Sequence, residues 1–214
     1  VLREAGGYRM WYSSAASNHS IGLAISQDGK FWRAYGDAPA LTIGPNGDWD
    51  DTHVSGAAVL RDTAGYKLYF SGYDGATWRI GLATSADGIT WQKQLTGPVL
   101  SEGATGQFDA RGVFAPAVLF QGGSYRMWYT GWDGYHHRIG LATSADGVTW
   151  SKYPGNPVLD LGPSGAWDNR GVSSPTVVFR NGQYELWYSN EWWFCGRCGQ
   201  RIGRATSEDG IAWI

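Results

Sequence analysis

The sequence is poor in several features that would otherwise assign its class. It contains only two cysteines and four lysines, and its formal net charge is −2. No apolar run approaches the roughly 18 residues that a membrane-spanning helix needs, so we expect a soluble protein with no membrane partner. The near-neutral charge argues against the basic surface that binds nucleic acid. A neutral binding partner is therefore favoured.

Glycine and aromatic residues are abundant instead. The chain has 32 glycines and 13 tryptophans, a composition typical of short strands joined by tight turns. The sequence IGLATSADGITW at 80–91 returns as IGLATSADGVTW at 139–150, 59 residues later, with looser copies that begin at Ile21 and Ile202. A second motif, YRMWY from Tyr8, follows the same period. A repeat of about 59 residues therefore organises the whole chain.

Each repeat is predicted to form four short antiparallel strands. In the second repeat we expect them at 57–60, 66–70, 80–85 and 90–92. The Asp87-Gly88 pair before the last strand favours a tight hairpin turn. Four-stranded antiparallel repeats that close radially form the blades of an all-β propeller, and the two-residue patterning excludes a helical solenoid.

The register of the repeat predicts about four blades in a single propeller domain spanning 1–214. We place blade 1 at 1–46, with most of its inner strand missing, and the others at 47–105, 106–164 and 165–214. This repeat length also suits a ring of five blades, in which case part of the ring is absent here. An open blade edge would then favour self-association.

The motifs together resemble the five-bladed propellers of glycoside hydrolase families 43 and 32, with the mannoside phosphorylases of family 130 as relatives. The resemblance covers the whole chain and rests on WY(S/T)G, IGLATS, SxDGxxW and a PVL segment, as at 98–100 and 157–159. It implies a carbohydrate substrate and no obligatory cofactor. It also implies that catalysis uses two aspartates and a glutamate on the inner strands of three successive blades.

The strict repeat separates scaffold from site, because a residue type present in every blade is more often structural. This filter assigns turn-forming roles to Asp28, Asp87, Asp146 and Asp209. It also favours a structural role for three aromatic-acid pairs: Trp49-Asp50, Phe108-Asp109 and Trp167-Asp168. Function is then expected among residues that differ between blades.

The tryptophans that break the repeat lie between the second and third strands of their blades. They are Trp78, Trp132, Trp192 and Trp193. In an up-and-down blade these loops emerge on the same face as the connectors that carry the aromatic-acid pairs. Exposed aromatic rings beside polar groups are suited to binding sugar rings. We therefore predict a sugar-binding face, while the alternative that these tryptophans cap the blades stays open.

Polar residues of the connectors and of the loops between the second and third strands supply the other candidate contacts. They are His53, Arg111, Asp133, His136, His137 and Arg170. Ion pairing is the alternative for the arginines, and a hydrogen-bonded core position or an exposed hairpin tip is the alternative for the histidines. A single histidine beside an inner strand is weak evidence for a metal, so we expect neither a metal nor a cofactor.

Two carboxylates, Asp51 and Glu191, are unique to their blades. Glycoside hydrolysis needs a general acid with a raised pKa and a second carboxylate that acts as base or nucleophile. The tryptophans that follow Glu191 provide an apolar setting that would raise its pKa. Our hypothesis is that Glu191 is the acid and that Asp51 is the base or an assisting acid.

The two cysteines, Cys195 and Cys198, lie in the loop that carries Glu191. A small disulfide is the favoured interpretation, because a redox motif opens a helix and a zinc site needs two further ligands. A disulfide would indicate a secreted or extracytoplasmic protein.

These observations favour a glycoside hydrolase-like propeller, of the family 43 type if active, that acts on or binds an oligosaccharide or polysaccharide. Two other classes stay open: a lectin-like propeller with a similar shallow site on each blade, and a non-catalytic fragment. The unlike carboxylates Asp51 and Glu191 favour the enzyme. The close similarity of blades 2 and 3 favours the lectin.

Overall fold

The computed structural model describes residues 1–14, 19–94, 96–190 and 200–214. All regular structure in these ranges is β-strand, in elements β1 to β15, so the all-β prediction is confirmed. None of the described residues forms a helix long and apolar enough to cross a membrane. The chain divides into two compact units, Val1–Leu100 and Ser101–Ile214, which are described separately.

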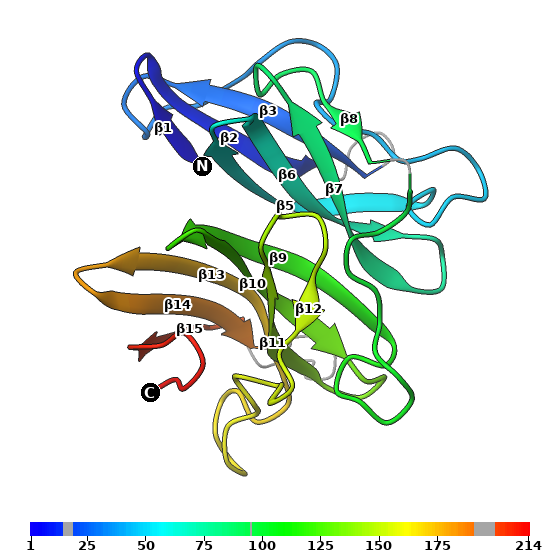
Figure 1. The fold of residues 1–214 in the computed structure, drawn as a ribbon, viewed down its shortest axis with the longest axis vertical. Coiled ribbons are helices and arrows are strands. Elements are labelled where there is room, and N and C mark those ends of the chain that lie inside the picture. The colour runs from blue at the N-terminus through cyan, green and yellow to red at the C-terminus, as the bar shows by residue number, and fades with distance from the viewer. Residues whose placement is uncertain (15–18, 95, 191–199) are drawn as a thin grey trace. The chain divides into compact units, whose positions relative to one another are not determined.

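The first unit contains two sets of antiparallel strands, which we call blades 1 and 2 (Figure 1). Within each blade, every strand pairs with the strand that follows it in the sequence. Blade 1 comprises β1 (Leu2–Glu4), β2 (Gly7–Ser14), β3 (Ser20–Ser26) and β4 (Arg33–Ala34). Blade 2 comprises β5 (His53–Asp62), β6 (Gly65–Tyr73), β7 (Trp78–Ser85) and β8 (Gln92–Lys93).

The second unit repeats this ladder order in blades 3 and 4. Blade 3 comprises β9 (Gly112–Gln121), β10 (Ser124–Trp132), β11 (His137–Ser144) and β12 (Ser151–Lys152). The described strands of blade 4 are β13 (Val172–Arg180), β14 (Gln183–Asn190) and β15 (Ile202–Ser207).

The turn before each fourth strand is built by one aspartate. In blade 2 the Asp87 carboxylate accepts hydrogen bonds from the backbone N–H groups of Ile89 and Thr90, both within 2.9 Å. Gly88 follows with φ of 73°, a left-handed conformation that favours glycine. The turn-forming role predicted for this aspartate is confirmed. The fourth strand begins at Gln92 rather than at Thr90 because the backbone of Thr90 belongs to the turn.

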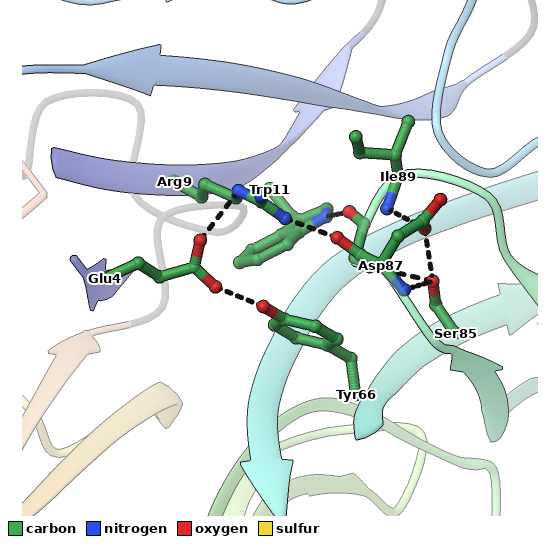
Figure 2. A network of polar contacts seen from close by, with 8 residues as sticks. Glu4, Arg9, Trp11, Tyr66, Ser85, Asp87 and Ile89 are labelled. Atoms are coloured by element: carbon green, nitrogen blue, oxygen red, sulfur yellow. Dashed lines mark hydrogen bonds and ion pairs between the residues drawn. The ribbon is translucent and has the colours of Figure 1, made fainter. Parts of the chain in front are cut away.

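A polar network joins blades 1 and 2 across their shared core (Figure 2). Arg9 forms an ion pair with Glu4 at 2.9 Å and donates a hydrogen bond to the backbone carbonyl of Asp87. The indole N–H of Trp11 donates to the carbonyl of Gly88 at 3.2 Å, and the Tyr66 hydroxyl donates to Glu4. The turn of one blade is thus held by the second strand of the blade before it.

Blades 3 and 4 have the same junction inside the second unit. Arg126 and the indole of Trp128 donate to the carbonyls of Asp209 and Gly210, at 2.6 and 2.9 Å. Trp128 is fully buried in an apolar cluster that includes Leu141 and Leu186. The motif that repeats in sequence therefore repeats as a blade-to-blade contact.

Candidate functional site

The connector that leads into β9 is fixed by a buried aspartate. Asp109 is 1% exposed and its Oδ2 accepts hydrogen bonds from Lys152 Nζ at 2.6 Å and from the Tyr129 hydroxyl at 3.0 Å. Burial, and then the negative charge of Asp109, raise the pKa of Tyr129, so this hydroxyl stays protonated and donates. A Cβ at Gly131 would lie 2.6 Å from Asp109 Cβ, which explains the glycine of the WYTG motif.

The other two aromatic-acid pairs have similar anchoring contacts. Asp50 is 2% exposed and pairs with Lys93 Nζ at 2.5 Å, and Asp168 accepts a hydrogen bond from the Tyr188 hydroxyl at 2.8 Å. The structural role predicted for these aspartates fits these contacts. Because each one fixes its connector, the residues that follow it are presented from a rigid base.

Asp51 follows the anchored Asp50 directly. Its Oδ2 accepts a hydrogen bond from the backbone N–H of Gly47 at 2.8 Å, and its Oδ1 accepts one from the Thr52 hydroxyl at 3.0 Å. The side chain is partly exposed. Asp51 is therefore an oriented carboxylate with local donors on both oxygens.

A cluster of aromatic rings lies beside Asp51, where β5 begins and the β6–β7 hairpin ends. Tyr73 and Trp78 are stacked, with ring centroids 4.7 Å apart and an interplanar angle of 23°. The His53 ring lies 6.0 Å from Trp78 and 5.6 Å from Tyr73. His19 packs against His53 with a centroid distance of 3.8 Å. We call His19, His53, Tyr73 and Trp78 the aromatic cluster.

His53 is constrained electrostatically as well as sterically. Its Nδ1 atom is buried and has no hydrogen-bond partner among the described residues. Burial lowers the pKa of His53, and the nearby His19 lowers it further. The neutral imidazole is therefore favoured. An unpaired buried ring nitrogen is a group that a ligand hydroxyl can satisfy.

The repeat register explains two members of the cluster that sequence reasoning did not select. His19 stands two residues before the IGLA motif, the position that Trp78 and His137 occupy in their blades. Tyr73 occupies the position of Trp132. Ranking loop residues by register rather than by residue type would have found both.

Blade 3 places different side chains at the corresponding positions. Gly112 stands where blade 2 has His53, and Trp132 and His137 pair across the hairpin with ring centroids 6.2 Å apart. Phe114 packs edge-on against His137 at 5.3 Å. Burial lowers the pKa of His137 to about 4, although the charge of Asp133 opposes this shift.

Asp133 and His136 belong to the hairpin tip. The Asp133 carboxylate accepts backbone hydrogen bonds from Tyr135 and His136, at 2.7 and 2.8 Å, and forms an ion pair with Arg138 at 2.6 Å. Burial opposes its ionisation, but these donors hold the pKa of Asp133 below its ordinary value. Blade 2 repeats the pair with Asp74 and Arg79 at 2.8 Å, which indicates that Asp133 shapes the hairpin.

The remaining predicted residues divide into two groups. Arg111 and Arg170 are exposed, and within the described part of the chain neither forms an ion pair, so the ion-pair alternative finds no support there. Glu191, Trp192, Trp193 and the two cysteines lie outside the described residues. Across the described ranges, no group of three or more His, Cys, Asp and Glu side chains is arranged to hold a metal ion.

Comparison with known proteins gives one family match. The model described as the glycosyl hydrolases family 32 N-terminal domain matches residues 63–191. An uncharacterized protein of Mycobacterium tuberculosis, present in two strains, is 36% identical over 188 residues, which cover 82% of this chain and 58% of that protein. The chain thus spans little more than half the length of that relative.

Two further comparisons concern proteins of stated activity. The 1,2-beta-oligomannan phosphorylase of Thermoanaerobacter sp. is 29% identical over 127 residues, which cover 54% of this chain and 42% of that enzyme. The crystal structure of a thermostable family-43 glycoside hydrolase matches with a TM-score of 0.76 at 19% identity, covering 100% of this chain and 69% of that one. This likeness shows the predicted propeller fold, while the number of blades and ring closure stay predictions.

Proposed function

Because the chain belongs to the family of the glycosyl hydrolases family 32 N-terminal domain, we propose that it is a carbohydrate-active propeller that binds an oligosaccharide and cleaves a glycosidic bond. The observation that carries the proposal is the aromatic cluster beside Asp51. The stacked Tyr73 and Trp78 rings offer an apolar surface, and His53 adds an unpaired buried nitrogen. A sugar ring needs both kinds of contact, one for its C–H face and one for its hydroxyls.

The proposed substrate class is a β-1,2-linked mannoside. It is supported by the likeness to the 1,2-beta-oligomannan phosphorylase. Hydrolysis and phosphorolysis differ only in whether water or phosphate accepts the glycosyl group. Both release the leaving sugar, but a hydrolase leaves the transferred glycosyl unit as a free sugar and a phosphorylase leaves it as a sugar 1-phosphate, so the sugar 1-phosphate distinguishes them.

The proposed catalytic pair is Asp51 and Glu191. Asp51 accepts two local hydrogen bonds, which orient its carboxylate, and we assign it the role of the base or of an assisting acid. The role of general acid then falls to Glu191. An extracytoplasmic location belongs to the same proposal and rests on Cys195 and Cys198.

Three variants, assayed against β-1,2-mannobiose and longer β-1,2-mannooligosaccharides with and without inorganic phosphate, test the proposal. Glu191→Gln is expected to abolish turnover and to keep binding. Trp78→Ala is expected to weaken binding roughly tenfold, as removal of an aromatic anchor does. Phe31→Ala is the control, because Phe31 is 82% exposed and lies outside the cluster. Absence of both binding and turnover in the unmodified protein would reject the mannoside assignment.

A further inference from the structure

Blade 3 contains a groove whose lining includes no residue of the aromatic cluster. Its volume is about 480 Å³, and it is lined by the connector before β9, the tip of the β10–β11 hairpin and the segment after β12. The lining side chains include Gln107, Tyr135, Arg138 and Asp160. All of the lining residues belong to blade 3, so the groove is described within a single blade.

The walls of the groove are held in place by an ion-pair chain. Arg138 Nη1 contacts Asp133 at 2.6 Å, and Arg138 Nε contacts Asp160 at 2.8 Å. Asp160 Oδ1 also accepts the backbone N–H of Leu161 at 2.7 Å. Burial opposes the charged form of Arg138, but its contacts with Asp133 and Asp160 raise the pKa of Arg138 above its ordinary value. The guanidinium is therefore a fixed, charged group.

Several groups on these walls retain unused hydrogen-bonding capacity. Within the described ranges, Arg138 Nη2 and Asp160 Oδ2 have no protein partner. Gln107 accepts the N–H of Ala104 through Oε1 at 3.0 Å, which leaves its amide N–H₂ available as a donor. Fixed donors and acceptors in one groove match the alternating donors and acceptors of vicinal hydroxyls.

The aromatic component is Tyr135, which is 78% exposed. The backbone of Tyr135 is held by the Asp133 carboxylate at 2.7 Å, so the residue is anchored although its ring faces solvent. An exposed, anchored ring beside fixed polar groups is the arrangement that stacks on a pyranose.

The charge of the groove distinguishes between ligand classes. Among the residues that line the groove, the two carboxylates Asp133 and Asp160 face the single guanidinium of Arg138, which leaves one net negative charge. This lining disfavours a phosphate or a uronic acid. It does not disfavour a neutral sugar.

The residues that line the groove of blade 3 are only partly repeated in blade 2. Blade 2 keeps the hairpin ion pair, Asp74 with Arg79. At the register positions of Tyr135 and Asp160, however, the sequence has Ala76 and Ser101. The hairpin scaffold is thus shared between the blades, whereas the groups that would contact a ligand are not.

We infer that this groove is a second carbohydrate subsite, which binds one neutral sugar unit of a longer chain on Tyr135, Asp160 and Arg138. The inference rests on the proposed function for the class of ligand. The groove shares no residue with the proposed catalytic pair, so the sugar unit that it binds is not one of the two units joined by the bond that is cleaved. The subsite therefore contributes to the affinity for long oligosaccharides and not for a disaccharide.

Tyr135→Ala tests the subsite, with Tyr135→Phe as the matched control that keeps the ring. The probes are β-1,2-mannobiose and a longer oligosaccharide of the same linkage. Tyr135→Ala is expected to weaken binding of the longer chain roughly tenfold, to leave turnover of the disaccharide unchanged and to preserve the fold, because the side chain is largely exposed. Tyr135→Phe should bind as the unmodified protein does.

The ring resonances of Tyr135, assigned by their absence in the Tyr135→Ala spectrum, report binding directly by NMR. A shift of these resonances on adding the longer oligosaccharide supports the subsite even if no turnover occurs, in which case the proposed function alone fails. Unshifted resonances overturn the subsite even if turnover is rapid. Equal affinity of Tyr135→Ala and the unmodified protein for the longer chain also overturns it.

Discussion

His53 and His137 are both held as neutral imidazoles, by different neighbours. The His53 ring packs against the His19 ring, with centroids 3.8 Å apart. Burial lowers the pKa of His53, and the nearby His19 lowers it further. His137 packs between Phe114 and Trp132, and burial alone dominates the lowering of its pKa. A neutral imidazole carries one donor and one acceptor, which suits contact with hydroxyls better than two donors do.

Burial of His137 makes the second unit sensitive to acid. The folded-state pKa is about 4, below the ordinary value of 6.5, so between these values the unfolded chain binds a proton that the folded chain excludes. Stability is therefore complete above pH 6.5 and is lost as the pH falls toward 4. The loss from His137 is expected to be about 3 kcal/mol.

The midpoint temperature of thermal unfolding, measured at several pH values between 7 and 4, tests this effect. This range covers the titration of a histidine from its ordinary pKa down to the lowered pKa of His137. His137→Phe and His137→Gln remove the titrating group with different packing, so both should flatten the dependence of stability on pH. If both proteins lose stability as steeply as the unmodified protein, His137 is not the group responsible.

The inner strands β5, β9 and β13 share a local irregularity, which in β5 and β13 is bonded to the preceding blade of the same unit. Each has a register shift, and the residue in the left-handed conformation is Gly56, Ala115 or Ser174, spaced by the 59-residue period. Such bulges bend a strand and leave one N–H group outside the ladder. In blades 2 and 4 that N–H donates to a hydroxyl of the preceding blade, Ser13 Oγ or Thr130 Oγ1, at 2.9 Å.

The hydroxyl of the WY(S/T)G motif is therefore expected to stabilise the bulge. Thr130 is fully buried, so Thr130→Val should leave the Ser174 N–H unpaired and lower the free energy of unfolding by about 1–3 kcal/mol. It should also speed hydrogen exchange at the Ser174 amide. Thr130→Ser keeps the acceptor, so exchange there should stay slow although a methyl group is lost. Slow exchange at Ser174 in the valine protein would contradict this role.

The elements were more predictable than the site. Strand order and the aspartate turns follow from a repeat that local hydrogen bonds enforce in every blade, as Ser85 and Asp87 do in blade 2. Strand ends were less predictable, because a side chain such as Asp87 decides whether Thr90 belongs to a turn. The repeat filter selected His53 and Trp78, but it did not predict that His19 comes from another blade to pack on His53, since no local pattern encodes that contact.

At the scale of the molecule, a regular scaffold carries unlike surfaces. The anchored connectors recur, as the pairs Lys93–Asp50 and Lys152–Asp109 illustrate. The hairpin ion pairs recur as Asp74–Arg79 and Asp133–Arg138. The groups presented by that scaffold differ: His53 and Trp78 in blade 2 have Gly112 and His137 as their register counterparts in blade 3. A lectin with one similar site on each blade would be expected to repeat its binding groups, so this divergence favours one asymmetric site.

The number and kind of binding sites distinguish these models. Calorimetric titration with a long β-1,2-mannooligosaccharide is expected to show one class of bound oligosaccharide, held by two unlike sites. Trp78→Ala and Tyr135→Ala should each weaken this binding roughly tenfold, and the double variant should lose the sum of the two binding free energies, because the aromatic cluster and the blade 3 groove share no side chain. Several equal sites, one on each blade, would instead indicate the lectin. Equivalent weak sites reach high overall affinity only when several of them bind the same oligosaccharide.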